Sequence, residues 1–261
     1  MANATAADAA GVIIYNNESG PFVGQLQDES RIPAVSISRE DGLALADLLN
    51  GEAVAVRLNV QARTETVDSR NVVARPPSGT CTIVLGGHYD GVPAGPGAND
   101  NASGTATVIE IARAMAADGT FDNVCFVLFG SEEIGLLGSE FYVGSLSADE
   151  LAALKAMLNF DMLAVGDEWP LIGSNEVVTV AAQEADELSI PHTARSNIPS
   201  GSGSDHAPFL RRGVPAMVFN CFCDPNYHTA DDRFEFVQEK RLAEAGAIGL
   251  ATAQALLAAL P

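Results

Sequence analysis

Several apolar runs in this chain end in a histidine or in acidic residues. TCTIVLGGHYD (80–90), NVCFVLFGSEE (123–133) and LNFDM (158–162) share this pattern. Such continuous apolar runs are typical of strands buried on both faces of a sheet. Because helical patterns separate them, we expect an α/β fold with an open, mostly parallel sheet and helices on both faces. The polar residues would then meet at the carboxyl edge of the sheet.

A polar segment, QARTETVDSR (61–70), divides the pattern in two. We expect a small α/β remnant over residues 1–60 and a larger domain over residues 61–261. In the small part the expected elements are helices 4–10 and 40–49 and strands 12–15, 34–38 and 53–58. In the large part they are strands 71–76, 81–90, 123–130, 156–160, 170–172 and 215–219, and helices 103–117, 135–144, 148–153, 177–187, 205–212 and 239–260.

The acidic balance of the chain limits its partners. The formal net charge is −20, and only Lys155 and Lys240 are lysines among the 14 basic residues. Such a surface repels phosphates and acidic membranes, so we expect neither nucleic acid nor a membrane as partner. It suits a high-salt habitat or serves solubility. The start, MANATAADAAGVIIY, lacks the basic region and long apolar stretch of a secretory signal, so we expect no signal peptide in this chain.

The four cysteines do not resemble a disulfide framework. Cys81 and Cys125 fall inside apolar runs, so we expect buried thiols on adjacent strands. Cys221 and Cys223 flank one residue, and strand geometry would hold their Cα atoms about 6–7 Å apart, which disfavours a bridge. We expect a structural role for this pair rather than a soft-metal site.

The first three polar motifs each have two interpretations. In GGHYD, the Asp90 carboxylate can reach the far nitrogen of His88, as a metal-binding histidine requires, or both residues end a solvated strand. In GANDNASG, Asp100 either caps the following helix or bridges two cations, and a neighbouring Asn or Ser can supply the cap in the second case. In GSEEIG, Glu132 and Glu133 either begin a solvated helix or repel one another unless a cation lies between them.

Asp161 in NFDM and His228 in NYHTADD complete the candidate ligands. Asp161 lies among apolar residues and needs a partner, which is either a cation or a structural hydrogen bond. His228 stands in a loop, where a lone histidine is more often solvated. Among the other histidines, His192 is expected in a solvated loop, and His206 at a helix start is a weaker candidate for lining the site.

The joint pattern is more specific than its parts. Two histidines and three carboxylates at successive strand ends match the ligand mix of zinc. Two metals about 3.5–4 Å apart, bridged by one carboxylate, are the arrangement found in aminopeptidases and phosphatases. The sequence therefore predicts a hydrolytic centre with two zinc ions.

Over residues 65–261 the sequence resembles the family 28 metallopeptidases, the co-catalytic zinc aminopeptidases of the bacterial leucyl aminopeptidase type. The resemblance rests on GGHYD, PGANDNASG, GSEEIGLLGS, NFDM, SDHAPF and YHTADD. It implies two Zn²⁺ per chain. The implied ligands are His88 and Asp161 for the first ion, Glu133 and His228 for the second, and Asp100 as the bridge between them.

The resemblance also implies roles for three further residues. Glu132 would be the general base, Asp90 would orient His88, and Tyr227 would offer its phenol to the developing oxyanion. A cis peptide bond would follow Asp100. The implied activity is hydrolysis of the amino-terminal peptide bond of peptides that carry a free amino terminus, and we expect apolar P1 residues.

Two alternatives to an aminopeptidase stay open. A carboxypeptidase or dipeptidase of the same family needs a basic residue toward the substrate carboxylate, and Arg211, Arg212 and Arg233 lie near the motifs without a distinctive setting. A non-catalytic binding module should have lost ligands or base, and none is lost. The side chains expected either to form an apolar specificity pocket or to belong to the core are Met162, Phe209, Phe219 and Phe222.

Residues 1–60 resemble the second half of a protease-associated domain, in GVIIYNNESGPF and IPAVSISREDG. The first half and the amino-terminal peptidase segment of relatives are missing, so we expect a truncated start or a lineage that lost them. Loss of the first half should leave one edge of strand 12–15 unpaired. We therefore expect residues 1–60 to dock either on the peptidase domain or on a second copy of the chain, and the second case would give a homodimer. Since relatives are usually exported, an extracytoplasmic location is expected by analogy.

Overall fold

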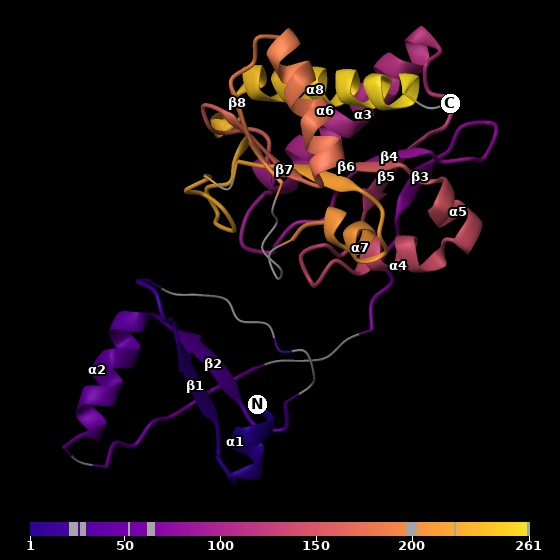
Figure 1. Cartoon of the computed structure of the whole chain (residues 1–261). Helices are drawn as coiled ribbons and strands as arrows, with labels where there is room; N and C mark the ends of the chain where they lie inside the picture. The colour runs from indigo at the N-terminus through magenta and orange to yellow at the C-terminus, as the bar shows by residue number, and fades with distance from the viewer. Residues whose placement is uncertain are drawn as a thin grey trace. The chain divides into compact units, whose positions relative to one another are not determined.

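The computed structural model describes residues 1–20, 26, 30–51, 53–61, 66–196, 203–221 and 223–259. The chain forms two compact units, Met1–Val67 and Asp68–Pro261. Each unit has its own sheet (Figure 1). Among the described residues, every helix is too short or too polar to cross a bilayer.

The smaller unit is built on a pair of parallel strands. Its elements are α1 (Ala2–Ala6), β1 (Val12–Tyr15), β2 (Ala34–Ile37) and α2 (Arg39–Leu49). The Ser38 hydroxyl accepts the amide of Asp41 at 3.1 Å and caps α2. The predicted strand at 53–58 was wrong. Its alternating pattern needs a hydrogen-bonding neighbour, and the described residues of this unit pair only β1 with β2.

The larger unit holds a mostly parallel sheet, which confirms the predicted fold class. Its strands lie in the order β3 (Val72–Ala74), β5 (Val124–Phe129), β4 (Ile83–His88), β6 (Ala156–Phe160), β9 (Ala216–Phe219), β7 (Trp169–Gly173) and β8 (His192–Arg195). The four strands β5, β4, β6 and β9 run parallel, while β3 and β7 pair antiparallel with β5 and β9.

Strand β8 was not predicted, and His192 begins it instead of lying in a loop. The segment is short, polar and partly exposed, and it pairs with β7 at the edge of the sheet. An edge strand of this kind carries no apolar run, so a search for buried strands misses it.

Helices cover both faces of the large sheet (Figure 1). Their bounds are α3 (Gly104–Asp118), α4 (Leu137–Ser145), α5 (Ala148–Ala153), α6 (Asn175–Glu187), α7 (His206–Arg211) and α8 (Glu239–Ala258), with the short turns η1 (Ala98–Ser103) and η2 (Phe234–Phe236). Neighbouring strand residues alternate between two cores. Leu85 and Leu158 join the core with α3, α6 and α8, while Val84 and Met157 join the core with α4 and α7.

The parallel strands bring the polar motifs to one edge of the sheet. His88 is the last residue of β4, and Asp161 directly follows β6. Glu132 and Glu133 stand just beyond β5, and His228 lies in the long loop after β9. Since parallel strands all end at the same edge, segments far apart in sequence meet there.

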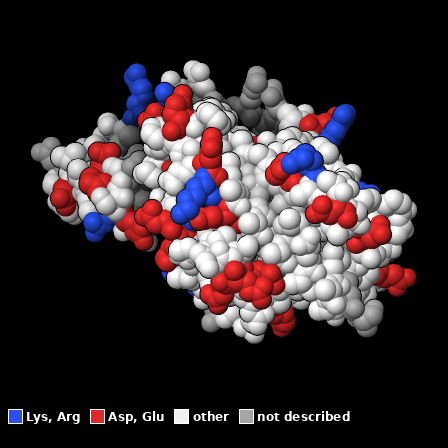
Figure 2. Space-filling model, turned by 90° about the horizontal axis from the view of Figure 1, so that it is seen from above, with Lys and Arg blue, Asp and Glu red and all other residues white. Residues whose placement is uncertain are grey.

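The surface carries the acidic excess of the composition. In the view of Figure 2, carboxylate groups outnumber basic groups. Some basic side chains are already paired on the surface, as Arg113 is with Glu110 and Arg211 with Glu140. The remaining field is negative.

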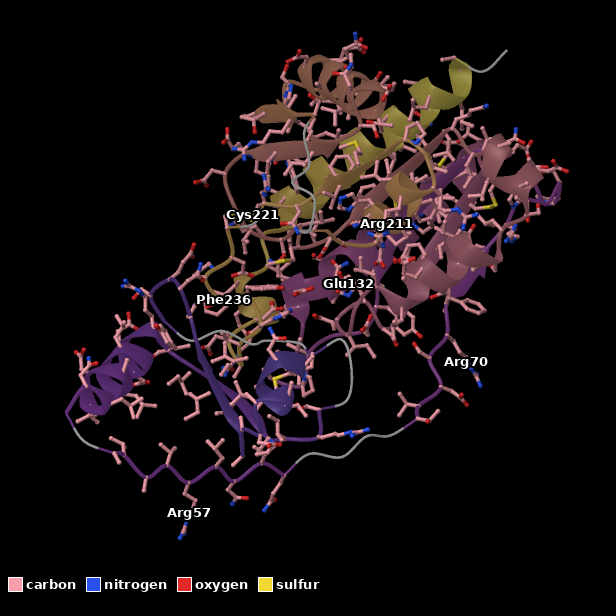
Figure 3. The ribbon with its side chains drawn as sticks, turned by 60° about the horizontal axis from the view of Figure 1, so that its bottom comes forward. Arg57, Arg70, Glu132, Arg211, Cys221 and Phe236 are labelled. Atoms are coloured by element: carbon pink, nitrogen blue, oxygen red, sulfur yellow. A yellow bond between two sulfur atoms is a disulfide. The ribbon has the colours of Figure 1, made fainter. Side chains whose placement is uncertain are left out.

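The cysteine prediction was wrong for both pairs, because Cys81 is bonded to Cys125 and Cys221 to Cys223. Cys81 lies two residues before β4, outside the strand ladder, and its Cα is 5.3 Å from that of Cys125. Cys221 stands two residues beyond the end of β9, and its Cα lies 5.1 Å from that of Cys223 (Figure 3). Both spacings suit a disulfide.

We expect the Cys81–Cys125 bridge to contribute most of the disulfide stabilisation. Its sequence separation of 44 restricts the unfolded chain by about 4 kcal/mol, whereas a separation of 2 gives about 1 kcal/mol. In urea unfolding, the double change Cys81→Ala with Cys125→Ala should lower the free energy of unfolding by about 4 kcal/mol. The matched control is Cys221→Ala with Cys223→Ala, and an equal loss in the control would contradict the loop-length argument.

Candidate metal centre

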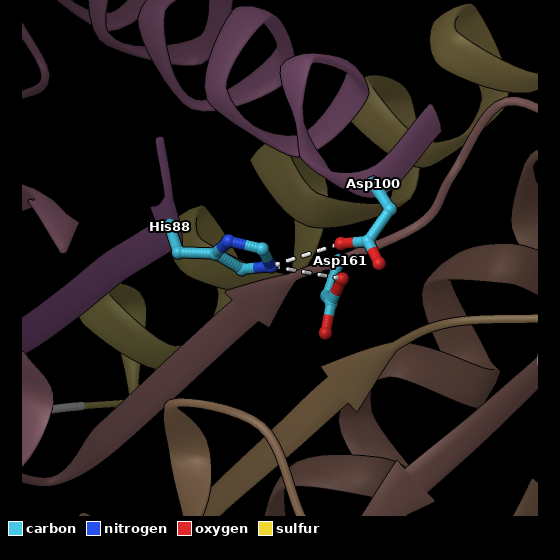
Figure 4. A group of neighbouring side chains, drawn as sticks. All are labelled: His88, Asp100 and Asp161. Atoms are coloured by element: carbon cyan, nitrogen blue, oxygen red, sulfur yellow. Dashed lines mark ion pairs between the residues drawn. The ribbon is translucent and has the colours of Figure 1, made fainter. Parts of the chain in front are cut away.

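Two histidines face one carboxylate at the edge of the large sheet. The Nε2 atom of His88 lies 3.2 Å from Asp100 Oδ1, and the Nε2 atom of His228 lies 3.1 Å from Asp100 Oδ2. His88 Nε2 is also 3.5 Å from Asp161 Oδ1 (Figure 4), and His228 Nε2 is 2.9 Å from Glu133 Oε2. The result is two histidine–carboxylate groups that share Asp100. The structure thus brings together all five residues that the resemblance singled out as ligands.

Asp90 links the end of β4 to the glutamate pair. Its main-chain carbonyl lies 3.0 Å from His88 Nδ1, which leaves Nε2 to face the carboxylates. Its carboxylate is farther from that nitrogen, at 3.6 Å, and instead accepts the amides of Glu132 and Glu133 at 3.0 and 3.3 Å. Asp90 therefore contacts His88 through its backbone carbonyl and its carboxylate, and its carboxylate also holds the glutamate amides.

The segment that carries Asp100 is fixed by its neighbour Asn101. The peptide bond between them is cis, as the resemblance implied. Asn101 Oδ1 accepts the amides of Gly104 and Met162 at 2.9 and 3.2 Å, and its Nδ2 donates to the Phe160 carbonyl at 2.9 Å. Asn101 thus caps the start of α3, so Asp100 is free to face the histidines. A Cβ at residue 104 would lie 2.1 Å from the Phe160 oxygen, which is why glycine stands there.

The carboxylates of the centre are short of positive charge. Burial, strengthened by Asp161, raises the pKa of Glu132 to about 9. Burial, strengthened by Asp100, raises the pKa of Glu133 to about 7. Burial lowers the pKa of His88, whereas its contacts with Asp100 and Asp161 raise it. The contacts outweigh the burial, so the pKa of His88 is raised overall. Such a crowd of acids is stable only with added cations or protons.

The donor set fits zinc. Two imidazoles and three carboxylates are ligands that zinc takes, and each group offers atoms within 4.8 Å of one another. The buried Oδ1 of Asp161 lies 3.5 Å from His88 Nε2 and accepts no hydrogen bond from the described residues. An acceptor left in this way at a buried position calls for a cation.

A cavity of about 390 Å³ opens beside the two groups. The candidate ligands in its wall are His88, Asp100, Glu133 and Asp161, and the other lining residues are Glu132, Met162, Gly203, Ser204, Asn220, Asp224 and Tyr227. Glu132 stands at the edge of the sheet (Figure 3). Tyr227 is half exposed, and its ring stacks on that of His228 with centroids 3.7 Å apart. Burial, with Asp100 and Glu133 nearby, raises the pKa of Tyr227, so its hydroxyl stays a donor.

Other predicted candidates lie elsewhere. Phe209 and Phe219 are fully buried in the cores, whereas Met162 does line the cavity. Phe222 lies outside the described residues. His206 is buried at the start of α7 and is not in the wall of the cavity, and burial lowers its pKa to about 4.

The cavity wall, as far as it is described, contains no lysine or arginine side chain. Arg211 pairs with Glu140, and Arg233 pairs with Asp231 at 3.3 Å, so both have partners on the surface. An acidic wall favours a substrate ammonium over a substrate carboxylate.

Two acidic residues beyond the predicted set also hold the centre. The Asp232 carboxylate accepts the amides of Asn99 and Asp100, and Asp224 accepts the side chain of Asn99. No sequence signal separates Asp232 from its neighbour Asp231 in TADD, because both are acidic residues of one loop.

Family models match both parts of the chain. Residues 71–253 match Peptidase family M28, and residues 1–45 match the PA domain. The chain belongs to peptidase family M28. Aminopeptidase YwaD of Bacillus subtilis is 34% identical over 264 residues, which cover 94% of this chain and 56% of that protein. The probable leucine aminopeptidase 2 of Trichophyton verrucosum is 36% identical over 228 residues, 80% of this chain and 46% of that protein. The M28 chain thus spans about half the length of the curated relatives it matches.

Solved structures share the M28 fold. The aminopeptidase from Aneurinibacillus sp. strain AM-1 has a TM-score of 0.79 and 32% identity, covering 96% of this chain and 64% of that one. A zinc aminopeptidase from Bacillus subtilis has a TM-score of 0.78 and 31% identity, covering 98% of this chain and 66% of that one.

Zinc should stabilise the folded chain through Asp100. At free zinc of 100 times the dissociation constant, the expected gain is about 2.7 kcal/mol per site. We expect Asp100→Asn to lose most of this gain because both groups share that carboxylate, and the exposed control Asp231→Asn to keep it. Chemical unfolding with zinc and with chelator measures the difference. If the free energy of unfolding of the wild-type chain is the same with zinc and with chelator, the centre binds no zinc.

Proposed function

We propose that this M28 chain is a zinc-dependent aminopeptidase that hydrolyses the amino-terminal peptide bond of peptides. The observation that carries the proposal is the pair of histidine–carboxylate groups sharing Asp100, placed beside an acidic cavity that holds Glu132. The similarity to proteins named aminopeptidases supports it.

Two Zn²⁺ per chain fit the donor atoms. His88 and Asp161 would hold one ion, His228 and Glu133 the other, with Asp100 between them. When bound, the ions supply Lewis acidity toward the scissile carbonyl and lower the pKa of water in the site.

Glu132 is the proposed general base. It lines the cavity, and its amide is held by Asp90 Oδ1 at 3.0 Å, so the start of its side chain is fixed. It would take a proton from the attacking water and pass it to the leaving amine. Burial raises its pKa, and cations bound beside it would lower that pKa again, so that Glu132 is ionised and can accept the proton.

Substrate binding follows from the charge of the cavity wall. Glu132 and Asp161 face the cavity and would hold the α-ammonium of the substrate. The Tyr227 hydroxyl would donate to the oxyanion that develops on the carbonyl. Met162 offers an apolar surface for the P1 side chain, in line with the leucine aminopeptidase names of the fungal relatives.

We also propose an extracytoplasmic location and a division at the polar junction. Two disulfides in one chain are typical of oxidising compartments. Residues 1–60 would form a partial protease-associated domain and residues 61–261 the peptidase domain, supported by the matches to the two family models.

Replacing the base should separate catalysis from metal binding. We expect Glu132→Gln to retain two zinc ions and to lose at least about a thousandfold in kcat, because a general base contributes roughly 10²–10⁴-fold and here also positions the nucleophile. Steady-state rates and metal analysis measure both. The control is Glu110→Gln on the exposed face of α3. A variant with only one zinc would make Glu132 a ligand.

Blocking groups on the substrate should reveal which end is recognised. Because the wall is acidic, we expect N-acetylation of a dipeptide to abolish turnover and C-terminal amidation to leave it within about threefold, since no basic residue of the described wall would bind the carboxylate. Rates on the free, acetylated and amidated forms of one dipeptide make the comparison. Turnover of the acetylated form at a comparable rate would favour a carboxypeptidase instead.

A further inference from the structure

Three successive amides of the segment that carries Asp100 donate to a single residue, Asp232. The Ala98 amide reaches the Asp232 main-chain oxygen at 3.3 Å. The amides of Asn99 and Asp100 reach its two carboxylate oxygens at 2.7 and 3.0 Å. Asp232 is only 4% exposed. Hydrogen bonds to a buried carboxylate are short and strong, so they hold the backbone of this segment in one geometry.

The Asn99 side chain adds two further contacts to the segment that carries Asp100. Its Nδ2 donates to Asp224 Oδ2 at 2.7 Å, and its Oδ1 accepts the amide of Ala164 at 2.7 Å. Asp224 precedes His228 in the loop after β9, and Asp232 follows it. The loop is thus tied to the Asp100 segment both before and after the histidine.

The same two segments approach closely at a further point. A Cβ added to Gly95 would lie 2.0 Å from the Thr229 carbonyl oxygen. Only glycine permits this approach, and Thr229 directly follows His228. The loop and the Asp100 segment are therefore packed backbone to backbone next to the histidine.

These contacts set a distance that the metal centre needs. His228 Nε2 and Asp100 Oδ2 are 3.1 Å apart, although each comes from a different loop. Neither loop is part of a strand ladder, so their spacing depends on the contacts between them. Asp232 supplies a carboxylate for two of those contacts and a carbonyl for a third.

We propose that Asp232 is a positioning residue that holds Asp100 at the distance from His228 at which both can bind one zinc ion. This inference rests on the proposed zinc centre. The positioning role requires a carboxylate at residue 232, because an amide side chain has one acceptor oxygen and would turn its NH₂ group toward a backbone N–H. Residues that support metal ligands from behind typically change metal affinity by about 10–100-fold when they are replaced.

Three variants test the inference. Asp232→Asn leaves one acceptor, Asp232→Ala leaves none, and Asp231→Asn is the control one residue away, with an exposed side chain. Competition against a chromophoric chelator gives the affinity and number of zinc ions, and unfolding of the zinc-free chain gives stability. We expect both Asp232 variants to bind at least one ion about 10–100-fold more weakly, with the larger loss of affinity in Asp232→Ala. The control should keep the wild-type affinity.

The kinetic readout follows from the same geometry. With zinc at saturation, kcat of Asp232→Asn should fall while KM changes by less than about threefold, since Glu132 and Asp161, the proposed contacts of the substrate ammonium, lie on other segments of the wall. Wild-type zinc affinity in Asp232→Asn, with only the stability of the zinc-free chain lowered, would make Asp232 purely structural and overturn the inference, as would failure of this variant to fold. A wild-type chain that binds no zinc would instead overturn the proposed function.

Discussion

Repulsion among buried carboxylates is the constraint on which the site depends. Asp100, Glu133 and Asp161 lie around two imidazoles, and Glu132 stands beside them in the same cavity wall. Burial pushes the pKa of both glutamates upward, because little water is present to solvate their charges. Cations relieve this repulsion and turn an unstable crowd of acids into a ligand set. The same carboxylates that destabilise this edge of the sheet by repulsion are therefore the groups suited to bind cations.

The sheet makes such crowding feasible. Parallel strands all end at one edge, so β4, β5 and β6 deliver His88, the glutamate pair and Asp161 to one place. Two cores on opposite faces hold these strands rigidly, with Leu85 and Val84 pointing to different sides. The loops are less constrained, and there the chain uses side-chain bonds to backbone amides, from Asp90 to the glutamates and from Asn101 to the end of β6.

Backbone amides recur as partners of the acids that do not belong to the ligand set. Asp90 accepts two amides and Asp232 accepts two, so each carboxylate is satisfied without a metal ion. The acids of the ligand set face imidazoles and the cavity instead. This division lets one small region hold many carboxylates, some fixing loops and others that the proposed function assigns to cations and to the substrate amine.

The sequence by itself determined which segments form the buried strands of the large sheet and which residues stand at their ends. Apolar runs report burial, and the motifs GGHYD, GSEEIG and NFDM follow such runs directly. Likeness to a known family pointed to the cis peptide bond after Asp100. The strand β8 escaped prediction because a short edge strand has no apolar run, and the strand at 53–58 was wrong because an alternating pattern does not guarantee a partner.

Only the tertiary structure decided the contacts between segments far apart in sequence. It joined Cys81 to Cys125, because the chain before β4 leaves the ladder and approaches β5. It placed the Asp90 carboxylate where it accepts the glutamate amides and still lies 3.6 Å from His88 Nδ1, and it chose Asp232 over Asp231 as the partner of the Asp100 segment. Periodicity and motif spacing indicate whether a side chain is buried and which chemical group it carries. Which distant amide or sulfur it meets depends on loop paths, and these are fixed only when the whole domain packs.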